Sequence, residues 1–255
     1  MRVLVCVKRV AMVGARIVLT ADEKDVDVRQ LGFTISPHEE CAIEEAVRVV
    51  EQRGGVVTVL TLGPPEAADQ LRDAASIGAN RLVHLVSDGR DWDPIATAGA
   101  IVDAIRRHEA ADGPYDLILL GNEAADTGDY QVGVRVAHAL GRPCVIGVKN
   151  LVVGEETVVA KREFRGGDEL YELAMPSVVA VKEGINLPRY PSLPGRVRAN
   201  KMAIAETTLE WRQGPVRLER LRVPSEPRER AEILGTGVDA VAALVDLLEQ
   251  WGVVA

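Results

Sequence analysis

The feature that most constrains the fold is an alternation of short apolar runs with helix-like stretches along the first 145 residues. The apolar runs occupy residues 3–7, 56–62, 82–86, 117–120 and 143–146. The stretches between them carry apolar side chains at helical spacing, over residues 39–51, 66–77, 95–108 and 130–140. Unbroken apolar strands that alternate with amphipathic helices are typical of a parallel sheet covered on both faces. The sequence therefore predicts an α/β fold with an open, mostly parallel, doubly wound sheet.

Two of the expected helices have well-marked starts. Ser36 is followed by Pro37 and, three positions on from the serine, by Glu39. This pattern predicts a capping box with proline at the first helical position, where its missing N–H is harmless. Asp93 and Pro94 open the third helix in the same way.

The pattern changes after residue 146. β-rich pieces at residues 148–153, 157–164 and 170–173 are separated by glycine-containing turns, and a buried-type strand follows at residues 177–181. This spacing predicts an antiparallel hairpin extension of the sheet. Residues 183–195 then contain three prolines and two glycines, which argue against a helix or a central strand and predict a long functional loop.

The C-terminal part differs again. Residues 203–236 are charged and irregular, and residues 238–248 form an amphipathic helical pattern. The charged stretch is interpreted either as a disordered tail or as a tethered arm, and the helix after it favours an arm that docks on a partner. We expect a nucleotide-binding α/β domain at residues 1–202 and an arm with a helix at residues 203–255.

The composition narrows the possible functions. Asp plus Glu is 38 and Lys plus Arg is 30, so the net charge is −8, and an acidic chain without a basic tract argues against nucleic acid as a partner. Three widely spaced cysteines indicate reduced thiols in a reducing compartment. The four histidines have no metal-ligand spacing, so no metal site is predicted. No stretch approaches the ~18 apolar residues of a membrane span. The first apolar run is too short for a signal peptide, so we expect a cytoplasmic protein without membrane insertion.

Ligands of an open α/β sheet bind beyond the carboxyl ends of its strands. Four segments should converge there: the residues from Lys8, the helix entry at Ser36, and the turns after Thr61 and Leu120. The last turn, residues 121–133, follows a strand and opens a helix, so its backbone N–H groups can face an anion.

Within this turn, Gly121 and Gly128 allow close backbone approach, and Thr127 and Gln131 can bind a phosphate or a ribose. An ordinary capped turn is the alternative. The turn lacks the lysine of a phosphate-binding loop, so nucleotide hydrolysis is not expected.

Other polar residues leave alternatives open. Asp126 and Asp129 are interpreted as helix caps or as a carboxylate pair for acid–base work or Mg²⁺. Lys8 and Arg9 either face a phosphate or are solvated. The histidines are interpreted as surface or packing residues. No nucleophile–histidine motif appears, so no catalytic residue is assigned.

Several of these stretches resemble the β subunits of electron transfer flavoproteins. The similarity covers roughly residues 1–205 and the tail only by position. Its weaker parts are residues 3–10, 36–48, 78–81, 119–121 and 131–133. The most specific parts are Lys-Arg-Glu-Phe-Arg-Gly-Gly-Asp at residues 161–168, Pro176, and Asn-Leu-Pro-Arg-Tyr-Pro-Ser-Leu-Pro at residues 186–194.

The resemblance implies an adenine-nucleotide α hydrolase-like sheet and a heterodimer. A partner α subunit would hold most of the site for a redox-active FAD, and this chain would be an electron-carrier subunit rather than an enzyme. Electrons would come from an acyl-CoA-type or other flavin dehydrogenase and leave to a downstream oxidoreductase. The chain itself would bind AMP or, as in the electron-bifurcating branch, a second FAD reduced by NADH.

The family's site residues transfer by position. The nucleotide site would comprise Cys6, Ser36, Leu62, Gly121, Asn122, Glu123, Ala124, Asp126, Thr127, Gly128, Asp129, Tyr130, Gln131 and Val132. Leu193 would dock on the dehydrogenase within the loop 184–195, beside Tyr190 and Arg189, which are residue types enriched at binding hot spots. Arg189 and Glu163 match a charged pair near the subunit and flavin region.

The turn departs from both branches of the family. Residues 126–131 are Asp-Thr-Gly-Asp-Tyr-Gln. The AMP-binding form has an acidic run followed by Asn-Gln-Thr, and the bifurcating form has Asp-Gly-Asp-Thr-Ala before a Gln-Val-Gly that this chain shares at residues 131–133. We favour AMP, with a second FAD as the alternative. A stand-alone nucleotide-binding regulator is an alternative of another class, but it would not need the proline-rich loop.

Overall fold

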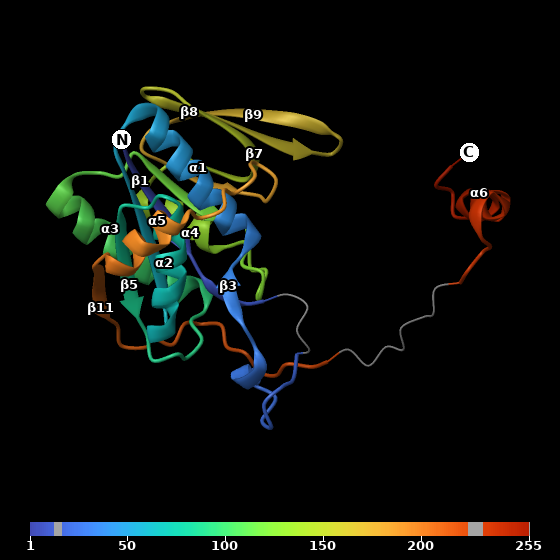
Figure 1. Ribbon diagram of the computed structural model, residues 1–255, viewed down its shortest axis with the longest axis horizontal. Coiled ribbons are helices and arrows are strands. Elements are labelled where there is room, and N and C mark those ends of the chain that lie inside the picture. Colours follow the sequence, from blue (N-terminus) through green and yellow to red (C-terminus); the bar gives the residue numbers. More distant parts are fainter. Residues whose placement is uncertain (13–16, 224–231, 255) are drawn as a thin grey trace. The chain divides into compact units, whose positions relative to one another are not determined.

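The structure, a computed structural model, describes residues 1–12, 17–223 and 232–254. The chain divides into two compact units, Met1–Glu219 and Arg220–Ala255. The first unit contains a nine-stranded sheet flanked by helices (Figure 1). The predicted α/β class is confirmed. The first unit extends past the boundary expected at residue 202, because the chain beyond that point adds one more strand to the sheet.

The sheet is parallel over most of its width. The strand order is β11-β5-β4-β1-β6-β10-β7-β8-β9, in which neighbours from β11 to β7 are parallel and the last two pairings are antiparallel. The bounds are β1 (Arg2–Val7), β4 (Val56–Gly63), β5 (Arg81–Val86), β6 (Leu117–Gly121), β7 (Cys144–Val153), β8 (Thr157–Phe164), β9 (Gly167–Ala174), β10 (Ser177–Val181) and β11 (Ile204–Thr208). β2 (Arg9–Ala11) and β3 (Phe33–Ile35) form a separate antiparallel pair.

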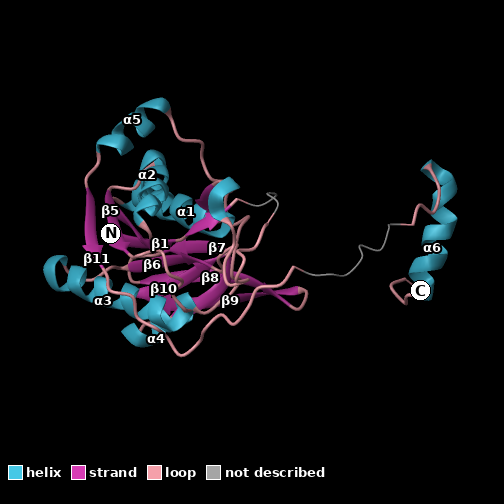
Figure 2. Cartoon of the chain, turned by 90° about the horizontal axis from the view of Figure 1, so that it is seen from below, coloured by secondary structure: helices cyan, strands magenta, loops and turns pink. Residues whose placement is uncertain are grey.

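Helices cover both faces of the sheet. α1 (Pro37–Arg53) and α2 (Ala68–Ile77) lie on one face, and α3 (Pro94–Asp112) and α4 (Val132–Leu140) lie on the other (Figure 2). Short 3₁₀ turns occur at Val28–Gln30 and Pro65–Ala67. α5 (Leu193–Lys201) packs against α2.

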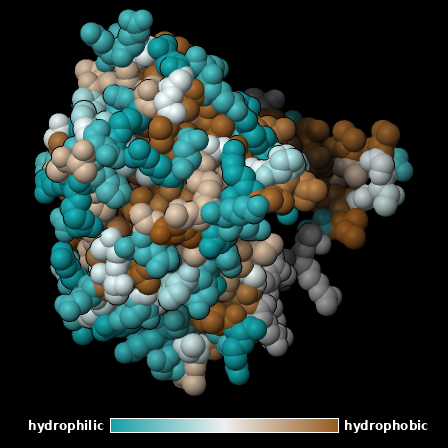
Figure 3. All heavy atoms as spheres, turned by 60° about the vertical axis from the view of Figure 1, so that its left-hand side comes forward, coloured by the Kyte–Doolittle hydropathy of each residue, from teal (hydrophilic) through white to brown (hydrophobic). Residues whose placement is uncertain are grey.

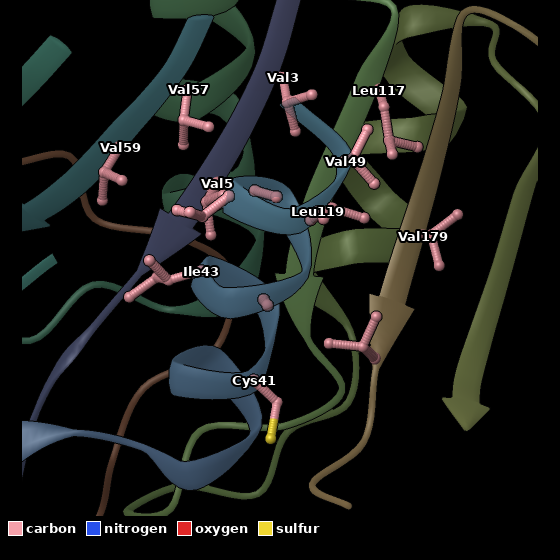
Figure 4. Packing of buried hydrophobic residues seen from close by; sticks show 14 of the residues in the cluster. Val3, Val5, Cys41, Ile43, Val49, Val57, Val59, Leu117, Leu119 and Val179 are labelled. Carbon is pink, nitrogen blue, oxygen red and sulfur yellow. The ribbon is translucent and has the colours of Figure 1, made fainter. Parts of the chain in front are cut away.

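Successive residues of the central strands supply two cores, because side chains of a strand alternate between its faces. Val3 and Val5 of β1 belong to the core under α1, and Leu4 and Cys6 belong to the core under α3 and α4. Figure 4 shows the first core, where valines and leucines of β1, β4 and β6 surround Ile43 of α1. Figure 3 brings forward the side that carries α3 and β11, where hydrophilic side chains surround smaller apolar areas.

The two marked helix starts differ in their capping. Asp93 caps α3 as predicted, since its Oδ1 accepts a hydrogen bond from the Ala96 N–H at 2.7 Å. Ser36 is the N-cap of α1 and Pro37 follows it, but the Ser36 side chain makes no capping bond. The serine half of the predicted capping box is therefore wrong, whereas the Glu39 carboxylate interacts with the Ser36 N–H as predicted and also accepts from the backbone N–H of Lys8 at 3.0 Å.

The hairpin extension is confirmed, and two adjoining expectations are corrected. The two strands expected at residues 143–146 and 148–153 form one strand, β7 (Cys144–Val153), with a register shift beside Gly147, whose φ is +74°. The loop expected over residues 184–195 ends at Ser192, because that serine caps α5 and accepts from the Gly195 N–H at 3.1 Å. Pro194 lies in the first turn of the helix, where proline is tolerated.

The second unit contains a 3₁₀ turn at Gly237–Asp239 and α6 (Ala240–Gln250), close to the helix expected there. Its apolar side chains Val241, Leu244 and Val245 are exposed. Of the charged arm expected over residues 203–236, residues 224–231 lie outside the described part. None of the described helices combines the length and apolar character needed to span a bilayer.

Candidate functional site

The four segments expected to converge do meet at the carboxyl edge of the sheet. The Lys8 ammonium, after β1, lies 2.7 Å from the Asp126 carboxylate in the turn after β6. His38 Nε2, at the start of α1, lies 3.4 Å from Glu123 Oε1 in the same turn. The buried Thr61 hydroxyl of β4 donates to the Val7 carbonyl at 2.9 Å. Side-chain contacts thus connect the ends of neighbouring segments.

The end of β6 approaches α1 closely at Gly121. A Cβ atom at this position would lie 2.6 Å from Glu39 Cγ and 3.2 Å from the Glu39 nitrogen, so only glycine fits. The next residue, Asn122, is buried, and its backbone N–H donates to the Val181 carbonyl of β10 at 2.8 Å. This packing fixes where the turn leaves the sheet.

Three buried polar atoms at this edge have no hydrogen-bond partner among the described residues: Ser36 Oγ, His38 Nδ1 and Asn122 Oδ1. A buried polar group left without a partner costs about 1–3 kcal/mol. Such atoms are uncommon in folded proteins and call for an explanation. A polar ligand bound at this edge would supply the missing partners.

The turn between β6 and α4 contains unusual backbone conformations. Tyr130 has φ of +55° and Gly128 has φ of +60°, and the Gly128 N–H donates to the Ala124 carbonyl at 2.9 Å. Gln131 precedes α4, but its side chain accepts from Arg135 at 2.7 Å and does not cap the helix. Within the part of the chain that the structure describes, no side chain caps the first turn of α4, so its N–H groups are suited to an anion.

The edge is acidic. Burial raises the pKa of Glu39 to about 8, although the N–H groups of Lys8 and Ser36 favour the charged form. Burial, with a contribution from Glu39, also raises the pKa of Cys6 to about 12. The pKa of Asp91, after β5, is raised by burial and by Asp126 and Asp129, while Lys8 opposes the change. The charges of the turn after β6 therefore influence the Asp91 carboxyl group.

Apolar residues complete the edge. Leu62 at the end of β4 and Val132 at the start of α4 are half-buried on the core under α3 and α4, and Trp92 packs on the same core. Cys6 is buried beneath them. Thr127 and Asp129 are exposed in the turn. Asp126, for which cap and carboxylate-pair roles were both open, pairs with Lys8 and accepts from the Thr127 N–H at 2.8 Å.

Four residues of this edge were not predicted as site residues: His38, Glu39, Asp91 and Trp92. His38, expected at the surface or as a packing residue, is buried beside Glu123. Glu39 was predicted only as a capping residue. Asp91 and Trp92 follow β5 at its carboxyl end, and this position was the signal that could have found them. Within the described residues, no cluster of three His, Cys, Asp or Glu side chains is arranged to hold a metal ion.

A second candidate surface lies on the segment before α5 and on the first residue of that helix. Leu187, Tyr190 and Leu193 are 84%, 96% and 76% exposed, and we call these three residues the recognition surface. The segment is attached to α1, because the Asn186 side-chain amide donates to the Cys41 carbonyl at 3.0 Å and to Glu45 Oε2 at 2.9 Å.

Arg189 strengthens this attachment. Its guanidinium bonds to Glu44 at 2.9 Å and to Glu51 at 2.6 Å, both on α1. Burial alone would raise the pKa of Glu44, but hydrogen bonds from Arg189 and Arg48 hold the pKa below its usual value. Among the ion pairs of the described residues, none joins Arg189 to Glu163, which lies opposite Asp168 in the β8–β9 hairpin. The charged pair suggested by the family resemblance therefore does not form within the chain.

Comparison with known proteins identifies relatives along most of the chain. A family model described as "Electron transfer flavoprotein domain" matches residues 26–210. "Electron transfer flavoprotein subunit beta" of Bacillus subtilis (strain 168) is 34% identical over 180 residues, which cover 70% of this chain and 68% of that protein. The protein of the same name from Bradyrhizobium diazoefficiens is 33% identical over 254 residues, or 98% of each chain. A mitochondrial β subunit from Oryza sativa subsp. japonica is 30% identical over 252 residues, again 98% of each.

Proposed function

Because this chain belongs to the electron transfer flavoprotein family as a β subunit, we propose that it binds an adenine nucleotide at the carboxyl edge of its sheet. AMP is favoured over a second FAD. The chain then acts as the β half of a heterodimeric electron carrier, whose flavin is held mainly by the α subunit. The flavin supplies the redox chemistry, and this chain contributes binding and orientation.

The observation that carries the proposal is the set of buried, unpartnered polar atoms at Ser36, His38 and Asn122. Hydroxyl and amide oxygens are suited to the donors of a ribose or an adenine ring. The first turn of α4, which the Gln131 side chain does not cap, is suited to a phosphate, and Lys8 supplies a cation at the same edge, paired with Asp126. Leu62 and Val132 offer apolar surface to a base. The residues present therefore fit a nucleotide.

Two further features support the roles of partners. The exposed apolar side chains of α6 need a surface to cover them, which supports docking of the second unit on the α subunit. The recognition surface supports docking of a flavin dehydrogenase through Leu193, because large apolar side chains held on an ordered segment lose little entropy on binding.

A second FAD in place of AMP is the retained alternative, favoured by the Gln-Val-Gly sequence at residues 131–133. A Cβ atom at Gly133 would make ordinary van der Waals contacts, 3.6 Å from Leu120 and 3.7 Å from Ala180, so the packing of α4 does not itself require this glycine. The flavin content of the purified heterodimer separates the two: about one flavin per heterodimer supports AMP, and about two support the bifurcating form.

The test of the nucleotide site uses two matched glycines. The purified heterodimer is denatured, and the released adenine nucleotide is identified and counted. Gly128→Ala and Gly166→Ala both place alanine at positive φ, +60° and +81°, with no protein atom closer than 3.9 Å to either Cβ. Each should lose about 1 kcal/mol of stability from backbone strain. Only Gly128→Ala should also lower nucleotide content. Equal nucleotide content in the two variants would contradict the site assignment, and a wild-type complex that releases no adenine nucleotide would contradict the proposed function.

A further inference from the structure

The loop between β5 and α3, residues 87–93, borders the candidate nucleotide site. Its Ser87 N–H donates to the Gly63 carbonyl at the end of β4 at 2.9 Å. Its Asp91 follows β5 at the carboxyl edge of the sheet, and the charges of Asp126, Asp129 and Lys8 act on its carboxyl group. Trp92 packs on the same core as Leu62 and Val132. This loop therefore contributes both a charged and an aromatic residue to the edge where the nucleotide is proposed to bind.

The chain that follows β11 makes hydrogen bonds to this loop. We call residues 209–216 the strap. It begins where the Leu209 N–H donates to the Val86 carbonyl at 2.8 Å. The Trp211 indole N–H donates to the Asp91 carbonyl at 2.9 Å, and the Arg90 guanidinium lies 4.5 Å from the centre of the Trp211 ring.

The other end of the strap is hydrogen-bonded to Asp93. One of its carboxylate oxygens accepts from the Ala96 N–H of α3, and the other accepts from the Val216 N–H at 3.1 Å. A Cβ atom at Gly214 would overlap this carboxylate, so a larger residue there would force Asp93 and the strap apart. The strap thus contacts the residues on both sides of Trp92, namely Asp91 and Asp93.

We propose that the strap is a positioning element of the nucleotide site, which holds the β5–α3 loop so that Trp92 forms an aromatic wall for the purine ring of the ligand. This inference rests on the proposed nucleotide-binding function and adds two elements to it. Trp92 becomes a binding residue, since aromatic side chains stack on nucleobases irrespective of base type. Trp211 becomes a positioning residue that acts through the Asp91 carbonyl.

The three tryptophans of the chain, Trp92, Trp211 and Trp251, allow a direct test. The β chain is labelled with 5-fluorotryptophan and combined with unlabelled α subunit, and bound nucleotide is removed. ¹⁹F NMR spectra are then recorded during titration with AMP, or with FAD if the flavin content is two per heterodimer. The Trp92 resonance should shift with saturation. The resonance of Trp251, which lies in the second compact unit, should stay in place and serves as the control.

A variant pair tests the strap itself. Trp211→Phe keeps a ring but removes the hydrogen bond to Asp91, and it should weaken nucleotide binding about three- to tenfold, the equivalent of one ordinary hydrogen bond. Arg212→Ala is the matched control, since it removes only a 3.5 Å ion pair with Asp103 on α3, and affinity should stay within about twofold. Gly214→Ala, which forces the strap away from Asp93, is a second variant and should weaken binding at least as much as Trp211→Phe.

The outcomes separate the two proposals. If the wild-type complex binds nucleotide while the Trp92 resonance stays in place, or while the affinities of Trp211→Phe and Gly214→Ala equal that of the wild type, the strap proposal is overturned and the nucleotide site stands. If the wild-type complex binds neither AMP nor FAD at this site, both proposals are overturned. A shifted Trp92 resonance together with weakened binding in the strap variants supports the inference.

Discussion

The carboxyl edge of the sheet and the recognition surface both lack contacts, but the missing contacts are of different kinds. At the edge, polar atoms of Ser36, His38 and Asn122 are buried without partners. On the segment before α5, the donors of Asn186 and Arg189 are bonded to α1, while Leu187, Tyr190 and Leu193 stand exposed. The first surface lacks hydrogen-bond partners and the second lacks apolar cover. The difference indicates a small polar ligand for one and a protein for the other.

Both surfaces depend on α1. Its first turn contributes His38 and Glu39 to the edge, and residues further along, Glu44 and Glu51, hold Arg189. A single buried helix therefore supports two surfaces of different chemistry. If the two surfaces are independent, a substitution on one should leave the other unchanged; a substitution that alters both would show that α1 couples them.

The largest effect is expected from Arg189→Ala. Glu44 is nearly fully buried, and without the Arg189 side chain its carboxylate keeps the half-exposed Arg48 as its only cation among the described residues, together with the backbone N–H of residue 189 at 3.2 Å. Removing one partner of a buried ion pair costs about 3 kcal/mol or more, so the urea midpoint of the heterodimer should fall clearly. The double variant Arg189→Ala with Glu44→Gln should recover part of the loss, because no charge then stays buried. An unchanged urea midpoint in the single variant would show that the attachment of Arg189 to α1 contributes nothing to stability. The nucleotide content should be unaffected in both variants.

Glu39 should make stability depend on pH. Its pKa rises from 4.5 to about 8 on folding, so between these values the folded chain keeps a proton that the unfolded chain releases. The stabilisation is complete below pH 4.5 and is lost as the pH rises through 8, which amounts to about 3 kcal/mol between pH 5 and 8. Glu39→Gln keeps an acceptor for the Lys8 N–H and should flatten this dependence. Thermal melting at several pH values, with Glu163→Gln on the hairpin as control, measures it; equal slopes for wild type and Glu39→Gln would refute the assignment.

Leu193→Ala should separate docking from stability. The side chain is exposed at the first position of α5, so the melting temperature should change little. Loss of a binding anchor should weaken dehydrogenase docking by upwards of about 1 kcal/mol, seen as slower flavin reduction at low carrier concentration. Leu170→Ala, another exposed leucine, on β9, is the control. If Leu193→Ala instead lowers the melting temperature and leaves electron transfer unchanged, the residue has a packing role.

The smallest effect concerns two helix caps. Replacing a working cap by alanine costs about 1 kcal/mol, which is expected for Asp93→Ala because its carboxylate accepts from Ala96 and Val216. Ser36→Ala should leave stability nearly unchanged, because the Ser36 hydroxyl caps nothing. Its effect should appear as several-fold weaker nucleotide binding in calorimetric titration. A normal capping loss at Ser36 with unchanged nucleotide affinity would remove this residue from the site.

Local signals in the sequence were sufficient for much of the fold. β8 and β10 have the predicted bounds, because glycine-containing turns and unbroken β-rich runs define them without help from distant residues. β11 was missed, since Ile-Ala-Glu-Thr-Thr is mostly polar and forms a strand only by pairing with β5, far away in sequence. α5 was missed because its proline was interpreted as a helix breaker, although a proline one residue after Leu193 lies within the first turn.

In the candidate site, too, the features that depend on contacts distant in sequence were not predicted. The convergence of Lys8, Ser36 and the turn after β6 follows from the rule that parallel strands end at one edge, and it was predicted. The buried state of His38 and Glu39 depends on how closely Gly121 approaches α1, which no local pattern encodes. The contribution of Asp91 and Trp92 depends on the strap, whose contacts join residues more than a hundred positions apart.

The position of β11 has a consequence for how the chain is synthesised. β5 is an apolar strand that pairs with β4 on one side and with β11 on the other. β11 leaves the ribosome after every other strand of the sheet. A nascent or truncated chain that ends near residue 202 exposes this second edge of β5 to other chains, and such edges promote aggregation. Once β11 has paired with β5, it forms the outer edge of the sheet. Its polar residues Glu206, Thr207 and Thr208 disfavour pairing with further strands. Shortening the protein at that point would therefore yield aggregates in place of a smaller folded domain.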